Sequence, residues 1–256
     1  MGKSKNRILR LKQFSVRDDR CAMKVGTDAL ILGAWAELPA PGLPMLDVGT
    51  GSGILALMAA QRSLEGPIIA VELDSEAAAQ ARENVGASPF ASRIRVEEAD
   101  FLQFAQNSPW AGRCGAVWLN PPYFRDKPAS PDPARTRARH ESALPLVDWF
   151  PACARLLTAT GSVSVVWPIE REEELIHVAS GSGFSAVRLL AIRGRSDGPV
   201  IRLAAVFSRN PIGDVHRNEL SIEERERTEG PPLRSAAYLN LLEPFVLSDG
   251  DPRRFA

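Results

Sequence analysis

The sequence predicts an α/β protein in which a mostly parallel sheet is covered by helices on both faces. The first indication is the alternation of short, apolar, β-branched runs with amphipathic segments along the 256-residue chain. The second is a turn with three glycines that directly follows the first of these runs. The third is the pair Asp197-Gly198 between the last two runs, which favours a hairpin. We therefore expect an antiparallel hairpin at the C-terminal side of the sheet.

The same pattern places each expected element. Seven strands are expected at Met45–Val48, Ile68–Glu72, Ile94–Glu97, Ala116–Leu119, Ser162–Trp167, Ala186–Ile192 and Val200–Phe207. Helices are expected at Ile54–Arg62, Ser75–Val85, Asp148–Thr158 and near Arg171–Ser180. Gly161 is expected to close the third helix. The charged stretch from Asn218 to Pro232 is expected to be a partly ordered excursion before the apolar segment Tyr238–Val246.

Length and composition favour a single domain. The chain has a mass of 27.8 kDa, with 45% hydrophobic and 24% charged residues, which is ordinary for a globular protein. No apolar run approaches the ~18 residues that cross a bilayer, and the N-terminus lacks the apolar core of a secretory signal. We expect a cytoplasmic protein. Cys21, Cys114 and Cys153 are too widely spaced for a metal clip and are expected to be isolated thiols.

The formal net charge is zero, but basic residues gather in two segments. The first runs from Met1 to Lys24 and has eight Lys or Arg residues against two Asp residues. The second is a Pro-rich stretch expected to form a loop over the active site, and its basic residues are Arg125, Lys127, Arg135, Arg137 and Arg139. Two such segments are suited to hold a polyanion by its phosphates. The alternative is that they are solvated loops.

The three-glycine turn indicates a cofactor site. The motif Gly49-Thr50-Gly51-Ser52-Gly53 leads from a strand into a helix, so the chain can turn tightly and bring its N–H groups close to a ligand. Glycine is needed where a Cβ would collide. The spacing differs from the G-x-G-x-x-G of dinucleotide sites, although nicotinamide binding is the main competitor. The motif therefore favours S-adenosylmethionine.

Acidic residues after successive strands support this interpretation. Glu72, with Leu73 beside it, ends the second strand, where a carboxylate can accept both ribose hydroxyls. Asp100 suits the adenine amino group, with Phe101 beside the ring, and Asp47 would face the methionine end or order the loop. Each has a structural alternative: Asp47 as a loop cap, Glu72 as a solvated strand end, and Asp100 as a helix cap.

The run Asn120-Pro121-Pro122-Tyr123-Phe124 predicts the catalytic platform. Proline has a fixed φ and no N–H, so the chain cannot continue a central strand here and must project its carbonyls and the Asn120 amide. Hydrogen bonds from a planar amine to the Asn120 side-chain oxygen and the Pro121 carbonyl would favour a pyramidal nitrogen, and no strong base is required. Tyr123 is expected to stack on the ring that carries the amine. Ordinary packing is the alternative for Tyr123.

These motifs resemble a known family. The block from Asp19 to Ala36 and the run from Leu46 to Arg62 are similar to the bacterial tRNA1(Val) (adenine-N6)-methyltransferases. Further similarity lies at Val71–Ala81, in Asn120–Tyr123 and in an Ala-Arg element near Arg135–Arg139. The glycine-rich and Asn-Pro-Pro-Tyr motifs are shared by many enzymes that methylate amines. The block Lys24–Trp35 is more particular to this family.

The resemblance implies a Rossmann-like methyltransferase with a seven-stranded sheet, which methylates N6 of an adenine next to the anticodon of a valine tRNA. Residues 1–256 are then one domain, in which residues 1–44 form a lid and RNA-contacting segment and residues 45–256 form the core. The implied catalytic residues are Asn120, Pro121, Pro122 and Tyr123. The implied cofactor residues are Lys24, Thr27, Asp28, Asp47, Gly49, Thr50, Gly51, Gly53, Glu72, Leu73, Asp100, Phe101 and Asn120. The implied tRNA-binding residues are Tyr123, Phe124, Arg125, Lys127, Arg135, Arg137 and Arg139.

Several alternatives stay open at this point. An Asn-Pro-Pro-Tyr platform equally accommodates a glutamine side-chain amide of a release factor or an amino group of ribosomal RNA. A protein that binds RNA without catalysis is a rival of another class. For Thr27 and Asp28 the alternative role is a helix cap. No His, Cys or carboxylate spacing indicates a metal, no membrane contact is expected, and a monomer is favoured.

Overall fold

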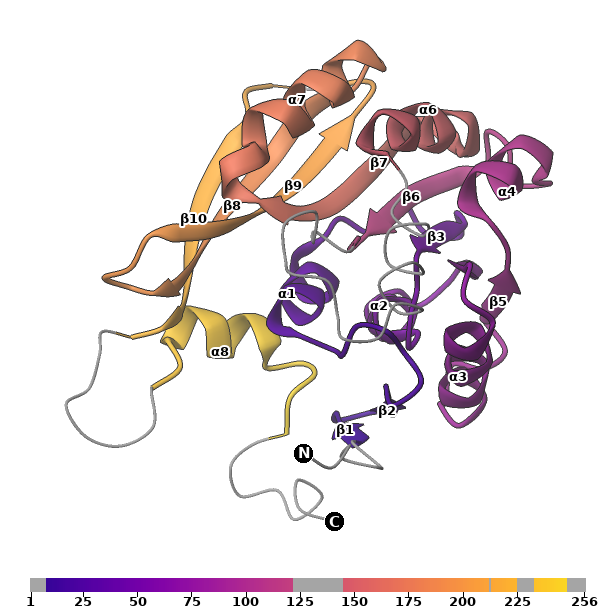
Figure 1. Cartoon of the computed structure of the whole chain (residues 1–256), viewed down its shortest axis with the longest axis horizontal. Coiled ribbons are helices and arrows are strands. Elements are labelled where there is room, and N and C mark those ends of the chain that lie inside the picture. Colours follow the sequence, from indigo (N-terminus) through magenta and orange to yellow (C-terminus); the bar gives the residue numbers. More distant parts are fainter. Residues whose placement is uncertain (1–7, 122–144, 212, 225–232, 248–256) are drawn as a thin grey trace, which may run out of the picture.

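The computed structural model describes residues 8–121, 145–211, 213–224 and 233–247, and Figure 1 shows how the elements are arranged. The strands are β1 (Ile8–Arg10), β2 (Ser15–Arg17), β3 (Met45–Val48), β4 (Ile68–Glu72), β5 (Ile94–Glu98), β6 (Cys114–Leu119), β7 (Leu157–Pro168), β8 (Ser185–Arg195), β9 (Val200–Ser208) and β10 (His216–Glu223). The helices are α1 (Thr27–Trp35), α2 (Ile54–Arg62), α3 (Ser75–Gly86), α4 (Phe101–Asn107), α6 (Leu146–Leu156), α7 (Glu172–Gly181), α8 (Ala236–Leu242) and the short 3-10 helix η1 (Ile169–Arg171). From β3 to β7 strands alternate with helices, as predicted.

The large sheet has the strand order β10-β8-β9-β7-β6-β3-β4-β5. The strands β3 to β7 pair in parallel, and β10 is parallel to β8. Strand β9 is antiparallel to both of its neighbours, β7 and β8. The prediction of a mostly parallel sheet with a C-terminal antiparallel hairpin is confirmed. The second strand of that hairpin, β9, lies between β7 and β8.

Within the described ranges the sheet has eight strands, one more than predicted. The additional strand β10 lies in the charged stretch that was expected to be a partly ordered excursion, and it pairs with β8 from His216 to Glu223. Only Leu220 and Ile222 of this strand are buried. An edge strand pairs on one side and buries few side chains, so its sequence shows little apolar alternation.

Helices cover both faces of the sheet, as predicted (Figure 1). Met45 of β3 and Ile68 of β4 belong to an apolar cluster that includes side chains of α1, α2 and α8. Leu46 and Ile69, one position further along, belong to a second cluster with side chains of α4, α6 and α7. Successive side chains of a strand point to opposite faces, so these two strands contribute to both clusters.

One predicted helix end is wrong. The helix expected at Asp148–Thr158 is α6, which ends at Leu156, and β7 begins at the next residue. Gly161, expected to close the helix, lies inside β7. A Cβ at Gly161 would come within 2.8 Å of Leu157 Cδ2 and 3.1 Å of the Cys114 carbonyl oxygen. This glycine is therefore required by close packing between β6 and β7.

The segment before β3 packs in the same apolar cluster as the end of the described chain. Leu11, Phe14 and Val16 join Phe245 in the cluster on the α1 side. Leu11 also forms an antiparallel bridge with Val246. Residues on both sides of the boundary expected at residues 44/45 therefore share one core.

All three cysteines are buried and free, which confirms that they are isolated thiols. Burial raises the pKa of Cys21 and of Cys114 to about 12. No described helix combines the length and the apolar character that crossing a membrane requires. Within the described ranges, no three His, Cys, Asp or Glu side chains are grouped as a metal site requires.

Candidate active site at the ends of β3 and β6

The carboxyl ends of β3 and β6 lie side by side, where the chain changes direction across the sheet. From β3 the chain continues to β4 and β5 on one side and then crosses to β6 and β7 on the other. Val48 of β3 is level with Leu119 of β6. Open α/β sheets bind ligands at such a switch point, beyond the carboxyl ends of the strands. The glycine-rich turn after Val48 and the Asn-Pro run after Leu119 are therefore neighbours.

The turn from β3 to α2 depends on glycine for its backbone conformation. Gly49, Gly51 and Gly53 have φ angles of 68°, 55° and 83°, a region that other residues rarely adopt. A Cβ added at Gly49 or Gly51 would meet no atom of the described residues within 4 Å, apart from its chain neighbours. The sequence predicts that a Cβ in this turn would collide with a neighbour. At Gly49 and Gly51 that neighbour is not a described protein atom. The space beside these two glycines is open to a ligand.

Asp47 orders the turn from inside the core. Its side chain is fully buried, and its Oδ2 accepts hydrogen bonds from Thr50 Oγ1 at 2.5 Å and from Ala56 N–H at 3.0 Å. Its Oδ1 is also buried and has no hydrogen-bond partner among the residues that the structure describes. Burial raises the pKa of this carboxyl to about 7. Of the two roles expected for Asp47, the geometry supports ordering of the loop.

Glu72 joins the end of β4 to the same turn. Its Oε2 accepts a hydrogen bond from Gly51 N–H at 2.8 Å, and its Oε1 accepts from Leu73 N–H at 2.9 Å and Asp74 N–H at 3.0 Å. A carboxylate has about four acceptor positions, so backbone N–H groups occupy three of them. Leu73 presents an exposed apolar side chain beside it. Glu72 is therefore a fixed acceptor beside the turn, and not a solvated strand end.

Asp100 and Phe101 follow β5 and have mainly structural contacts. Asp100 is the N-cap of α4, and its Oδ1 accepts a hydrogen bond from Gln103 N–H at 2.9 Å. This is the helix-cap alternative, which occupies only one of its two oxygens. Phe101 is buried and belongs to the apolar cluster that includes Val48. The structure thus places Phe101 in the core, away from an open surface.

Asn120 and Pro121 follow β6 and are half-buried. They are the described part of the expected platform, and they lie at the central position of the sheet between β3 and β7. The other residues predicted for this platform and for tRNA binding lie outside the described residues. They are Pro122, Tyr123, Phe124, Arg125, Lys127, Arg135, Arg137 and Arg139.

The N-terminal segment from Asp18 to Asp28 is held by its own backbone and by a carboxylate. Lys24 Nζ donates to the carbonyl oxygens of Asp18 and Cys21. Asp18 is buried, and its Oδ2 accepts a hydrogen bond from Val25 N–H at 2.8 Å. Lys24 thus stabilises the fold of this segment.

Thr27 and Asp28 form the first turn of α1, and neither caps it, since the N-cap is Gly26. Asp28 Oδ2 forms an ion pair with Arg202 Nε of β9 at 3.1 Å. Arg202 is level with Pro168 at the carboxyl end of β7. The ion pair therefore connects the start of α1 to the side of the sheet where the carboxyl ends of the parallel strands, and the predicted site, lie.

Two buried amides on α3 attach residues 17–20 of the N-terminal segment to that helix. No role was predicted for these amides from the sequence. Gln80 Oε1 accepts from Arg20 N–H at 2.9 Å, and its Nε2 donates to Asp19 Oδ1 at 2.7 Å. Asn84 Oδ1 accepts from Arg17 N–H at 2.9 Å. Its Nδ2 donates to the carbonyl oxygens of Arg17 at 2.7 Å and Ser52 at 2.8 Å.

Asn84 therefore connects the segment directly to the glycine-rich turn, which contains Ser52. Gln80 and Asn84 are one helical turn apart on a face that also buries Ala77 and Ala81. Two amides on a helix face otherwise made of alanines were the feature of the sequence that could have indicated this attachment. A buried polar group requires partners, and only the fold shows which ones.

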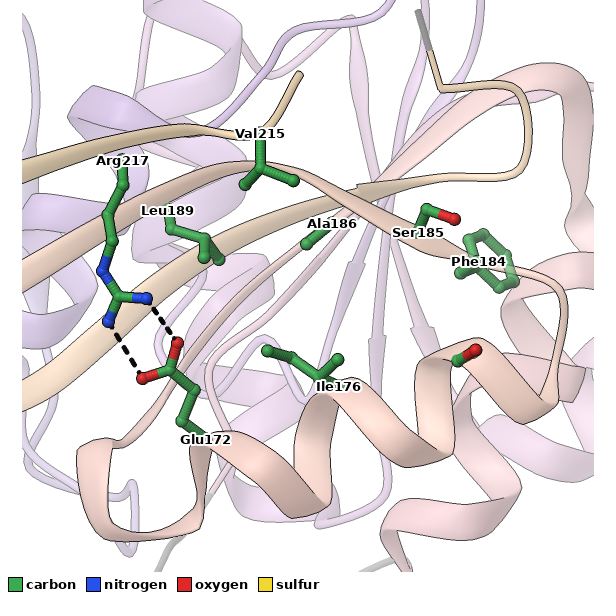
Figure 2. Close-up of a pocket in the computed structure, with 9 residues that line it drawn as sticks. Glu172, Ile176, Phe184, Ser185, Ala186, Leu189, Val215 and Arg217 are labelled. Carbon is green, nitrogen blue, oxygen red and sulfur yellow. Dashed lines mark hydrogen bonds and ion pairs between the residues drawn. The ribbon is translucent and has the colours of Figure 1, made fainter. Parts of the chain in front are cut away.

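A separate hollow lies away from the predicted site, between α7 and the strands β8 and β10 (Figure 2). It has a volume of about 470 Å³, with Ile176, Leu189 and Val215 among its lining residues. Glu172 accepts two hydrogen bonds from Arg217, at 2.8 and 3.0 Å. None of the predicted site residues that the structure describes lines this hollow.

Comparison with protein families agrees with this arrangement. A model described as a methyltransferase domain matches residues 45–121. This range begins at β3 and ends at Pro121. It therefore contains both the glycine-rich turn and the Asn-Pro run.

Relatives with a common name match most of the chain. The tRNA1(Val) (adenine(37)-N6)-methyltransferase of Aeromonas salmonicida is 40% identical over 237 residues, covering 92% of this chain and 95% of the relative. The protein of that name from Parabacteroides distasonis is 38% identical over 223 residues, covering 87% and 92%. The one from Trichodesmium erythraeum is 35% identical over 240 residues, covering 93% and 97%.

Solved structures show the same fold. A crystal structure described as a predicted O-methyltransferase from Agrobacterium tumefaciens has a TM-score of 0.66 at 19% identity, covering 85% of this chain and 96% of that chain. The geranyl diphosphate C-methyltransferase of Streptomyces coelicolor A3(2) has a TM-score of 0.52 at 13% identity, covering 71% and 79%. At this level of identity the likeness concerns the fold alone.

Proposed function

Because this chain belongs to the family of tRNA1(Val) (adenine(37)-N6)-methyltransferases, we propose that it methylates N6 of adenine 37 in a valine tRNA with S-adenosylmethionine as the donor. The observation that carries the proposal is the register of β3 with β6, which places the glycine-rich turn beside Asn120. The turn is suited to the donor and the Asn-Pro run to a planar amine. One methyl transfer requires both at the same place.

The residues around the turn fit S-adenosylmethionine. The open space beside Gly49 and Gly51 would receive its methionine part. Glu72 would accept hydrogen bonds from the two ribose hydroxyls. Backbone N–H groups already occupy three of its about four acceptor positions, so accepting both hydroxyls would require Glu72 to release Gly51 N–H. Asp100 has a second oxygen beyond its capping bond, which would accept from the adenine amino group. When bound, S-adenosylmethionine supplies an electrophilic methyl group.

Asn120 and Pro121 would hold the acceptor amine. The lone pair of adenine N6 is delocalised into the ring, so the nitrogen is a poor nucleophile. Hydrogen bonds from N6–H to the Asn120 side-chain oxygen and the Pro121 carbonyl favour a pyramidal nitrogen with a more available lone pair. As the N–C bond forms, the bond between the methyl carbon and the sulfonium sulfur would break and a neutral thioether would leave. The N6 proton becomes acidic only at this stage and would pass to solvent, so positioning and fixed acceptors supply much of the rate.

We assign binding of the tRNA to the residues after Pro121. Tyr123 would stack on adenine, an interaction worth roughly 1–3 kcal/mol per base. An anticodon-loop base is already unpaired, so turning it into the site costs less than extruding it from a duplex. Phosphate contacts are assigned to the basic residues Arg125, Lys127, Arg135, Arg137 and Arg139. One chain supplies the turn and the platform, which supports a monomer, and a tRNA substrate supports a cytoplasmic location.

The test supplies labelled S-adenosylmethionine and the purified protein with total tRNA, ribosomal RNA and a release factor in parallel. Label is expected only in tRNA, and nucleoside mass spectrometry is expected to find N6-methyladenosine. A valine tRNA transcript with guanine in place of adenine 37 serves as the matched control and is expected to stay unlabelled. Label in the release factor alone, or equal label in the control transcript, would refute the proposal.

A further inference from the structure

The short hairpin of β1 and β2 presents two arginines on one face. Arg10 pairs with Ser15 and Ile8 pairs with Arg17 in the antiparallel register. Paired residues lie on the same side of such a hairpin, and positions two apart share a face. Val16 points the other way and is buried in the core. Arg10 and Arg17 therefore project together from the outer face.

These arginines line a hollow of about 370 Å³ between the hairpin and the end of α3. Ser15 adds a hydroxyl to its wall, and Glu83 and Asn84 line the α3 side. The hollow is separate from the larger one in Figure 2, because the two share no lining residue. It is a recess with two cationic side chains on one wall.

Among residues 8–24, which the structure describes, the other basic side chains are engaged within the protein. Lys12 pairs with Glu243 at 2.6 Å, Arg20 pairs with Glu83, and Lys24 donates to backbone carbonyls. Within the described part of the chain, the side chains of Arg10 and Arg17 form neither an ion pair nor a hydrogen bond. The hollow therefore contains two guanidinium groups that have no compensating partner among the described residues.

The local charge favours an anion. Glu83 is the only carboxylate that lines the described hollow, and Arg20 compensates it. Helix α3 ends here with a partial negative charge of roughly half an elementary charge. That offsets only part of the two guanidinium charges. The recess therefore keeps a net positive charge, and guanidinium groups can bind phosphate oxygens in a bidentate manner.

The hollow is also firmly connected to the proposed active site. Both backbone groups of Arg17 are bonded to the Asn84 side chain, which also donates to the Ser52 carbonyl in the glycine-rich turn. One buried side chain thus fixes the position of Arg17 relative to that turn. The same side chain, Asn84, connects the hollow to the turn, and a polymeric substrate is long enough to contact both.

We propose that Arg10 and Arg17, with the Ser15 hydroxyl, bind a backbone phosphate of the substrate RNA in this hollow. This proposal rests on the proposed function. It replaces a general RNA contact of the basic segment from Met1 to Lys24 with one phosphate-binding site. Lys12, Arg20 and Lys24 have structural roles instead. The expected ligand is an RNA phosphodiester, recognised by charge and geometry without reading of the base.

The test measures affinity for a valine tRNA transcript at several KCl concentrations, for the wild type, Arg10→Gln, Arg17→Gln and the double variant. The two side chains share one phosphate, so loss of this contact in the double variant is expected to lower the steepness of log K against log[KCl] by about 0.7–0.9 and to weaken binding about fivefold near 0.1 M salt. We expect the KM for tRNA to rise and kcat at saturating tRNA to stay unchanged. Both side chains lie outside the core, so Tm is expected to stay unchanged.

Lys12→Gln is the matched control, because it removes one charge from the same hairpin at an ion-paired position. It is expected to keep the wild-type salt dependence. A double variant with wild-type affinity and salt dependence would overturn the inference, while methylation of tRNA by the wild type would leave the proposed function standing. A wild type that labels only protein would overturn both.

Discussion

The glycine-rich turn and the N-terminal segment are both predicted to contact the cofactor, but they are held in different ways. The turn is fixed by carboxylates that accept its N–H and hydroxyl groups, and one of them, Asp47, is fully buried. The segment is attached by the amides of Gln80 and Asn84 and by the half-buried ion pair of Asp28 with Arg202.

This difference has an energetic meaning. A buried polar group that loses its partner costs about 1–3 kcal/mol, and more when it is charged. A solvent-exposed ion pair contributes about 0–1 kcal/mol. The turn is therefore part of the folded core, whereas the contact of Asp28 with the sheet can be exchanged at little cost. An exchangeable contact of this kind is what the lid role implied for residues 1–44 requires.

The largest effect is expected at Asp47, through the pH dependence of stability. Its folded-state pKa of about 7 lies above the ordinary value of 3.8, chiefly because of burial. The folded state then binds more protons than the unfolded state between these values, so stability falls as pH rises from about 4 to 7. The span corresponds to about 4 kcal/mol. Asp47→Asn keeps an acceptor for Thr50 and Ala56 and is expected to remove this slope.

Urea unfolding of wild type and Asp47→Asn at pH 5 and pH 8 measures the effect. The stability difference should shift in favour of the variant at pH 8, with all other groups common to both proteins. Glu97→Gln is a control on β5, where the carboxylate pairs with Arg95 at the surface, and it should leave the slope unchanged. If the free energy of unfolding changed equally with pH in the wild type and in Asp47→Asn, ionisation of Asp47 would not contribute to stability and the prediction would be wrong.

The next largest effect is expected for Asn120→Ala, which separates cofactor binding from catalysis. Loss of one fixed hydrogen-bonding group lowers turnover by about 10²-fold or more. Cofactor affinity should stay nearly intact, because the proposed contacts to the methionine part and the ribose come from the turn and Glu72, which lie on other elements. Single-turnover rates and equilibrium binding of S-adenosylmethionine measure the two quantities. Equal turnover of variant and wild type would remove Asn120 from catalysis.

The first part of the sheet was predictable to the residue, and the reason is physical. Buried parallel strands leave continuous apolar runs, so the expected bounds of β3, β4 and α2 coincide with those observed. The neighbourhood of the turn and Asn120 also followed from strand order once the family was named. Strand β10 was missed because an edge strand with two buried side chains has almost no pattern.

The network of Gln80 and Asn84 was not predictable for a different reason. Their partners Arg20 and Arg17 are 60 and 67 positions away in the sequence. No local pattern specifies such a contact. Similarly, Glu72 was expected at the cofactor, but its bond to Gly51 N–H arises only because the ends of β3 and β4 are adjacent.

Glu72→Gln tests the junction between the turn and the ribose site. A hydrogen bond to a charged group contributes about 1.5–3 kcal/mol, so the KM for S-adenosylmethionine is expected to rise about tenfold. One oxygen becomes an NH₂ group, which cannot accept the N–H bonds now made to it. Turnover at saturating cofactor should change little. A lower Tm with an unchanged KM would show that the carboxylate serves only the turn.

The smallest effect is expected for Asp28→Asn, which tests the attachment of the segment. The Asp28 and Arg202 side chains are 28% and 29% exposed, so solvent screens their ion pair and its loss should cost about 0.5 kcal/mol. The cost should shrink in 1 M NaCl, where the Debye length is about 3 Å. Glu172→Gln, at the ion pair with Arg217 beside the larger hollow, is a control of similar size. A loss above about 2 kcal/mol would put this contact in the same energetic class as the buried turn and would contradict an exchangeable lid, because breaking a buried pair costs that much or more.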